Sequence, residues 1–212
     1  MIALRLMPVL LLALMLLPLP RDAARAMELK HIRLNDGTPA LYATGEIGPG
    51  DAEALRAALD EVSKDRFGAR VVRLNSPGGS VFHAMQMAQV FDEMRVMAVV
   101  AWDDLCASAR AAILFIAADA RLLLGNGRLM FHGCEPGNTT SELSRLMCTG
   151  DIGRFAGEQG FSPDWLFMGL QGAEERDTEL YVNLRSIGCM GLQQPPGLAH
   201  YGARQTRACN WP

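Results

Sequence analysis

Apolar and polar positions along the chain follow two spacings, one of about two residues and one of three to four. The two-residue alternation and short apolar runs predict strands at 28–34, 40–46, 70–75, 96–101, 122–124, 129–131 and 179–183. The longer spacing predicts helices at 51–62, 81–91, 107–118 and 141–156, and a helix that starts at 162–164. Strands and helices alternate, which is typical of an α/β fold with a largely parallel sheet.

Three turns separate the early elements. Residues 35–37, Asn-Asp-Gly, lie between the first two predicted strands, and Asp51 follows a Gly-Pro-Gly segment in a position typical of a helix N-cap. The third turn holds Gly78 and Gly79 between a strand and a helix. Adjacent glycines there have two explanations: a plain strand-to-helix connection, or a backbone that something must approach closely.

The first 26 residues have the pattern of a secretory signal peptide. Arg5 precedes an apolar run over 6–19, and Ala24-Arg25-Ala26 is a small-x-small cleavage pattern. We therefore predict a signal peptide at 1–26, a mature chain from Met27, and a periplasmic or secreted location.

A membrane anchor is the alternative interpretation of this segment. The run is short for a span, which needs roughly 20 apolar residues, and it is broken by Pro8 and Pro18. We expect no stable membrane span after cleavage.

Composition limits the size of the fold and the kind of partner. The chain has 212 residues, half of them hydrophobic, which is enough for one well-packed domain. We place this domain at 27–190 and an irregular C-terminal tail at 191–212. The formal net charge is −3, whereas a protein that binds nucleic acid through phosphate contacts needs a basic surface. We therefore expect no nucleic-acid partner.

The five cysteines change meaning if the chain is exported, because an oxidising compartment permits disulfides. Pairing neighbours would join Cys134 to Cys148 and Cys189 to Cys209, and would leave Cys106 as a small buried residue. The sequence does not determine the connectivity. Cysteines and histidines lack the close paired spacing of a zinc site, so we expect no metal.

Three segments together favour acyl-transfer chemistry. They are the Gly78-Gly79 turn, Ser108 at the start of an apolar helix, and His132 at the end of a strand. A serine hydroxyl becomes a good nucleophile when a base such as histidine takes its proton. The developing oxyanion needs fixed donors, and the backbone N–H groups of Gly78 or Gly79 and of Ala109 are the candidates.

The segments "GEI…LNSPGGSV…CASA…RLMFHG" resemble the Clp-type serine peptidases and their exported relatives, members of the crotonase-like superfold. The similarity runs from about residue 45 to 188. It implies a fold of repeated β-β-α units, with Ser108 as nucleophile, His132 as base and Asp177, in Glu-Arg-Asp, as the orienting carboxylate. It also implies a peptide or protein substrate, no cofactor, and association into homo-oligomers.

Each candidate also has a structural interpretation. Ser108 can be the N-cap of the helix that follows it, and His132 a histidine that ends a strand. Asp164, at a helix start, competes with Asp177 for the third role. His83 lies on the helix after the glycines, where a surface position is the simpler expectation.

Arg110 departs from the family pattern, which usually has small residues after the nucleophile. It can crowd the site, bind a substrate carboxylate, or pair with Asp103 or Asp104, and we favour the ion pair.

Two function classes follow. The first is an exported serine peptidase-like hydrolase; the second is a catalytically inactive binding or assembly module on the same fold, supported by Arg110. A crotonase-type acyl-CoA enzyme is disfavoured because export removes the chain from the CoA pool. A serine/lysine dyad is also disfavoured, because the two lysines, Lys30 and Lys64, stand at no recognisable motif.

Overall fold

The structure is a computed structural model that describes residues 27–132, 142–159, 166–167, 170–171 and 180–183; side chains are not described at 109–111 and 142–149. Its strands are β1 (Glu28–Arg33), β2 (Pro39–Thr44), β3 (Arg70–Asn75), β4 (Val96–Ala101), β5 (Leu105–Cys106), β6 (Ala120–Leu124), β7 (Arg128–Phe131) and β8 (Leu180–Asn183). Its helices are α1 (Asp51–Asp60), α2 (Val81–Met94), α3 (Ser108–Ala117) and α4 (Glu142–Glu158).

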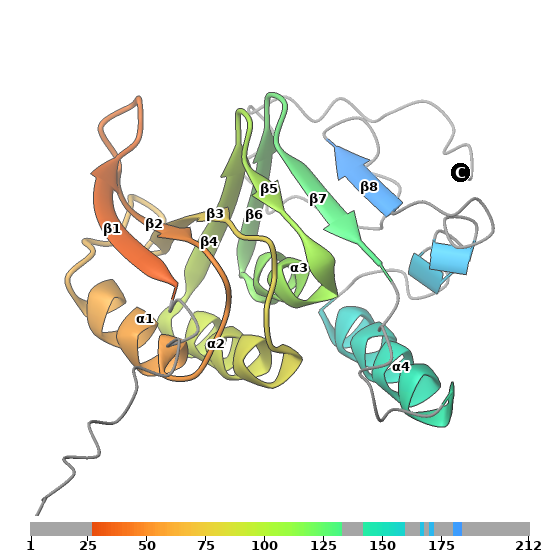
Figure 1. Ribbon diagram of the computed structural model, residues 1–212. Helices are drawn as coiled ribbons and strands as arrows, with labels where there is room; N and C mark the ends of the chain where they lie inside the picture. Colours follow the sequence, from red (N-terminus) through yellow and green to blue (C-terminus); the bar gives the residue numbers. More distant parts are fainter. Residues whose placement is uncertain (1–26, 133–141, 160–165, 168–169, 172–179, 184–212) are drawn as a thin grey trace, which may run out of the picture.

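A five-stranded sheet in the order β1-β2-β3-β4-β6 forms the centre of the fold (Figure 1). β1 and β2 form the predicted antiparallel hairpin, and the remaining neighbours run parallel. Apolar residues of β2, β3 and β4 pack against α1, α2 and α3 in one large core. The prediction of an α/β fold with a largely parallel sheet is confirmed.

A second sheet, in the order β5-β7-β8, was not predicted from the sequence. β5 has only two residues and runs parallel to β7, while β8 pairs with β7 in the antiparallel direction. α3 lies between α2 and β7 and is internal, as expected: Ala112, Ile113, Leu114, Phe115 and Ile116 are fully buried. The start of α3 is thus positioned by both sheets.

One local prediction is wrong, and several fall outside the described residues. The N-cap of α1 is Gly50, at a φ of 85°, and Asp51 is the first helical residue. Gly50 takes the cap because the preceding turn needs a left-handed residue there. The signal peptide at 1–26, the helix start at 162–164 and the tail at 191–212 lie outside the described residues. Among the described helices, none is long and apolar enough to cross a membrane.

Candidate active site

The glycine turn and the start of α3 lie side by side. Ser76, which follows β3, forms a bridge with Cys106 of β5. The Ser76 N–H donates to the Leu105 carbonyl at 2.9 Å, and the Ala107 N–H donates to the Ser76 carbonyl at 2.7 Å. These bonds extend the end of β3 along β5 and bring the turn at 77–79 to Ser108.

Gly78 leaves no room for a side chain between the turn and Ser108. A Cβ at Gly78 would lie 2.7 Å from the Ser108 Cβ and 3.3 Å from its Oγ. The φ of Gly78 is +107°, a conformation that favours glycine. The backbone at Gly78 is therefore bare on the side that faces the candidate nucleophile.

At position 79 a glycine is required because the Ile47 backbone lies against it. A Cβ there would collide with the backbone of Ile47. The Ile47 N–H donates to the Gly78 carbonyl at 2.7 Å, and the Ser80 N–H donates to the Ile47 carbonyl at 2.9 Å. The two glycines are thus needed because other parts of the chain approach their backbone closely. Ser108 approaches Gly78, and the Ile47 backbone approaches Gly79.

Ser108 is not the N-cap of α3. Ala107 occupies the N-cap position, without a side-chain cap, and Ser108 is the first helical residue. The φ of Ser108 is +69°, which costs an L-residue on the order of 1–3 kcal/mol. Its side chain is 3 % exposed, and within the described part of the chain its Oγ has no hydrogen-bond partner. A capping role does not explain this residue.

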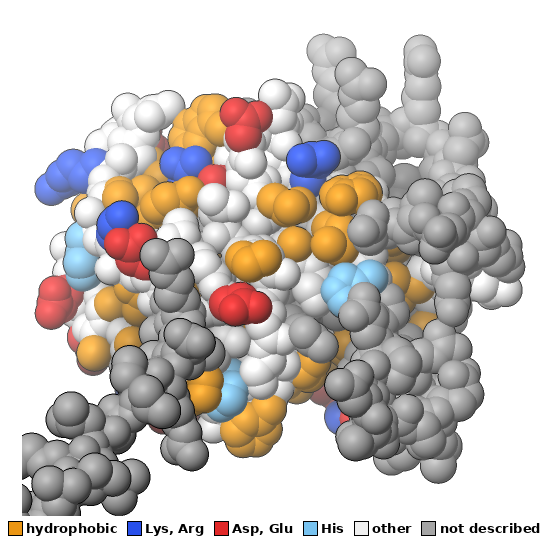
Figure 2. Space-filling view, in the orientation of Figure 1, with side chains coloured by type: hydrophobic (Ala, Val, Ile, Leu, Met, Phe, Trp, Pro, Cys, Tyr) orange, Lys and Arg blue, Asp and Glu red, His pale blue; other side chains and the backbone are white. Residues whose placement is uncertain are grey.

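His132 follows β7 directly and is half-buried. β7 runs parallel to β5, with Leu129 beside Cys106. His132 is three residues beyond Leu129, and Ser108 is two residues beyond Cys106. Both candidates therefore leave the carboxyl ends of neighbouring parallel strands. Hydrophobic side chains gather on the face formed by β5 and β7, next to residues that are not described (Figure 2).

The two glycine N–H groups differ in what they contact. The Gly78 N–H donates to the Ser76 Oγ at 3.1 Å, and that hydroxyl itself donates to the Gly45 carbonyl at 2.7 Å. The bridge between Gly79 and Ile47 uses the Gly78 carbonyl and the Ser80 N–H, not the Gly79 N–H. The Ala109 N–H lies in the first turn of α3, where N–H groups lack intrahelical partners.

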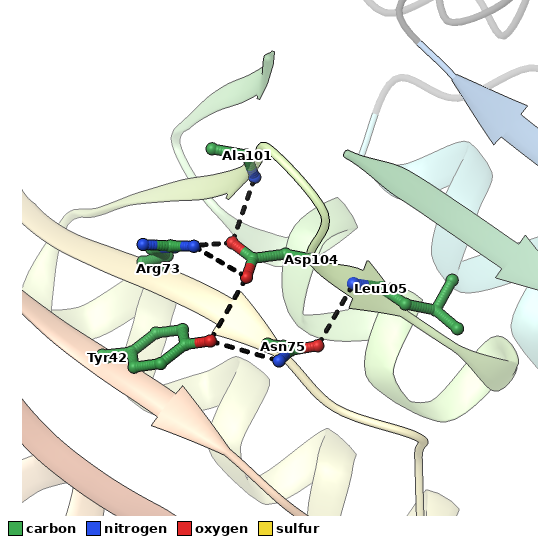
Figure 3. A network of polar contacts seen from close by, with 6 residues as sticks. All are labelled: Tyr42, Arg73, Asn75, Ala101, Asp104 and Leu105. Carbon is green, nitrogen blue, oxygen red and sulfur yellow. Dashed lines mark hydrogen bonds and ion pairs between the residues drawn. The ribbon is translucent and has the colours of Figure 1, made fainter. Parts of the chain in front are cut away.

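A polar network holds the start of β5 against β2 and β3 (Figure 3). This network was not predicted from the sequence. Asp104 is 3 % exposed and accepts two bonds from the Arg73 guanidinium, at 2.6 and 2.9 Å. Tyr42 donates its hydroxyl to the same carboxylate at 3.2 Å, and Asn75 accepts from the Leu105 N–H at 3.2 Å. The network joins β2 and β3 to the segment that leads into Ser108.

This network gives Asp104 a partner that was not predicted from the sequence. Asp104 pairs with Arg73. The expected ion pair of Arg110 with Asp103 or Asp104 stays a prediction, because the Arg110 side chain is not described. Asp103 is exposed. An arginine in a central strand was the available signal, because a charged residue there needs a partner.

Aromatic rings and charge complete the environment of Arg73. Its guanidinium lies 4.7 Å from the Tyr42 ring centre and 4.6 Å from that of Trp102. The hydrogen bonds with Asp104 raise the pKa of Arg73 above its ordinary value. This cation is therefore permanently charged and held in one orientation.

The remaining sequence candidates contribute less to the geometry. Cys106 is fully buried, as expected, and burial raises the pKa of its thiol. His83 lies in the first turn of α2, half-buried, with its ring edge-on to Phe82. The Cys148 side chain is not described, and the following candidates lie outside the described residues: Cys134, Asp164, Asp177, Cys189 and Cys209. Among the described residues, no cluster of His, Cys, Asp or Glu is suited to a metal ion.

Comparison with known proteins identifies the fold. Neither a protein-family model nor a curated protein sequence matches the chain. A mutant of ClpP1 from Listeria monocytogenes matches with a TM-score of 0.52 and 17 % identity, over 71 % of this chain and 85 % of that one. The ClpP protease catalytic domain from Plasmodium falciparum matches with a TM-score of 0.49 and 18 % identity, over 71 % and 79 %. The chain has a Clp-protease-like fold.

Proposed function

We propose that the protein is an exported serine peptidase-like hydrolase with Ser108 as its nucleophile. The observation that carries the proposal is the Ser108 Oγ, which is buried, unbonded within the described residues and set at a positive φ beside the bare Gly78 backbone. A structural serine at this position would normally satisfy its hydroxyl. A non-glycine residue held at a strained φ is a feature of functional sites.

The reaction assigned to this site is acyl transfer from a peptide or protein substrate. Ser108 attacks the carbonyl carbon while His132 takes the hydroxyl proton and later gives it to the leaving amine. Asp177 is the proposed orienting carboxylate. A water molecule then releases the acyl group from Ser108 by the same proton transfers in reverse.

The Gly79 and Ala109 N–H groups are the proposed oxyanion donors. The Gly79 N–H is not used in the bridge to Ile47, whereas the Gly78 N–H already donates to Ser76. Ala109 adds the first-turn N–H of α3, where the helix dipole favours negative charge. Gly78 then has a steric role, because its lack of a side chain lets the turn lie directly against Ser108.

Export and assembly complete the proposal. Signal-peptide cleavage after Ala26 would place the mature chain in the periplasm or outside the cell, where the proposed pairs Cys134–Cys148 and Cys189–Cys209 can form. Association into homo-oligomers follows from the resemblance to Clp-type peptidases.

A fluorophosphonate probe on the purified mature protein tests the nucleophile. We expect one labelled peptide, containing Ser108, and loss of labelling in Ser108→Ala and His132→Ala. Ser80→Ala is the matched control, because Ser80 is a nearby hydroxyl at the N-cap of α2, and this variant should keep its labelling.

The second candidate function predicts the opposite result. A folded protein without labelling at Ser108 would favour a non-catalytic binding or assembly module. The observation behind it is Arg110, a cationic residue in the first turn of α3, two positions after Ser108.

A further inference from the structure

Two carboxylates are buried among the described residues, and they differ in their partners. Asp104 is paired with Arg73. Asp51, the first residue of α1, is 1 % exposed and accepts two backbone N–H groups of the described residues: Met27 at 3.0 Å on Oδ1 and Gly48 at 2.6 Å on Oδ2. Within the described residues, no lysine, arginine or histidine is paired with Asp51.

A buried carboxylate without a cation is expensive. Removing a charge from water costs several kcal/mol unless an opposite charge and hydrogen bonds compensate. Two N–H donors and the amino end of α1 compensate Asp51 in part, because the helix dipole favours negative charge there. What Asp51 lacks within the described part of the chain is a positive partner, and the atom on its Oδ1 is the Met27 nitrogen.

We infer that Asp51 is the binding site for the processed amino terminus. Hydrolysis of the Ala26–Met27 peptide bond by a signal peptidase consumes one water, leaves a carboxylate on Ala26 and frees the Met27 amine, which takes up a proton. The nitrogen that donates one neutral N–H to Asp51 then becomes an ammonium with three donors. Cleavage therefore replaces a hydrogen bond from a neutral donor by a buried ion pair.

The Asp51 carboxylate is also connected, through hydrogen bonds and the backbone, to the candidate oxyanion turn at Gly78 and Gly79. Asp51 accepts from the Gly48 N–H, and Gly48 follows Ile47 directly. Ile47 is the residue whose backbone bonds hold Gly78 and Ser80 on either side of Gly79. The ion pair consequently fixes the segment on which the turn depends, and the uncleaved protein has a less rigid site.

This inference rests on the proposed function for its effect on Ser108, but the ion pair can be measured separately. First, mass spectrometry of the exported protein establishes whether the chain starts at Met27; another terminus would overturn the inference. Then two amino termini, Met27 and an extension starting at Ala24, are each combined with Asp51 and with Asp51→Asn. Glu53→Gln is the matched control, because Glu53 is an exposed acid in the same helical turn.

We expect the extension to lower the melting temperature by about 5 °C when Asp51 is present, in the original and in the Glu53→Gln protein. We expect little change when Asp51 is replaced by Asn. The extension should also slow fluorophosphonate labelling of Ser108 about tenfold. An equal temperature shift with Asp51 and with Asn would overturn the ion pair.

Failure of the ion pair and failure of the proposed hydrolase function give different results in this experiment. Coupled melting shifts with no Ser108 labelling in any protein would support the ion pair and remove the proposed hydrolase function. Equal labelling of Ser108 in all proteins without coupled melting shifts would overturn the ion pair and support the proposed hydrolase function. If Asp51→Asn does not fold, an amine-selective acylating reagent on the unaltered mature protein decides: the Met27 amine should react at least tenfold faster in urea, and equal rates would overturn the inference.

Discussion

Arginine, aspartate and glycine occur both in the turn of the β1–β2 hairpin and at the carboxyl end of β3. In the turn they make contacts close in sequence, and at the end of β3 they contact distant parts of the chain. In the hairpin, Arg33 donates to the Gly37 carbonyl at 2.9 Å, and the Thr38 N–H donates to Asp36 at 2.9 Å. Both of these turn bonds join residues no more than four apart, and a Cβ on Gly37 would meet nothing within 4 Å. The hairpin glycine is needed only for its positive φ, of +83°.

At the end of β3 the partners come from distant parts of the chain. Arg73 pairs with Asp104, 31 residues away, and Gly79 lies against Ile47. Gly78 lies against Ser108. Here arginine, aspartate and glycine join separate elements, so we expect a change in any of them to affect Ser108. The comparison shows that a turn that supports a site can be recognised by the sequence distance of its contacts.

Gly79→Ala should give the largest effect of this comparison. The added Cβ collides with the Ile47 backbone, and neither backbone can move without breaking the bonds between them. We expect a loss of roughly 3–5 kcal/mol in the free energy of unfolding, measured by urea denaturation. Gly37→Ala is the control and should cost about 1 kcal/mol. Equal losses would remove the distinction between the two turns.

Asp104→Ala should follow, with a loss of about 3 kcal/mol. The change strands the Arg73 guanidinium, whose side chain is only 23 % exposed, and removes a bond to the Ala101 N–H. The loop before Ser108 also loses its anchor, so fluorophosphonate labelling should slow. Asp103→Ala tests the neighbouring, exposed carboxylate and should change the free energy of unfolding by less than about 0.5 kcal/mol. A similar loss in both variants would contradict the role of the network.

Asp36→Asn should have the smallest effect. Hydrogen bonds from Thr38 lower the pKa of Asp36 below its ordinary value of 3.8, so the folded state favours the ionised carboxylate. That stability is present above about pH 4 and is lost as the pH falls through the lower folded pKa. The variant should melt at most about 2 °C below the parent at pH 7, and the difference should shrink as the pH falls below about 4. A difference that grows on acidification would contradict the local origin of the shift.

The same contrast explains which parts of the fold could be predicted. The hairpin and the alternation of strands and helices depend on local periodicity and turn residues, which the sequence contains. β5 has two residues and no period, so the second sheet could not be found. Its bridge to Ser76 exists only because the end of β3 and β5 meet in space.

The candidate site divides in the same manner. The positions of Ser108 and His132 came from a resemblance that spans ordered motifs, and the glycine pair indicated a close approach. The difference between the Gly78 and Gly79 N–H groups could not be predicted, because it depends on Ser76 and on Ile47 from another strand end. The ion pair of Arg73 with Asp104 was missed for the same reason.

The burial of Met27 has a consequence for the order of events in the life of the protein. Met27 is 5 % exposed and its nitrogen is bonded to Asp51, so the Ala26–Met27 bond adjoins a packed core. A peptidase must bind its substrate in an extended form, with residues on both sides of the cut bond. The proposed cleavage at this bond would therefore have to precede folding, and a chain that folded first would keep residues 1–26.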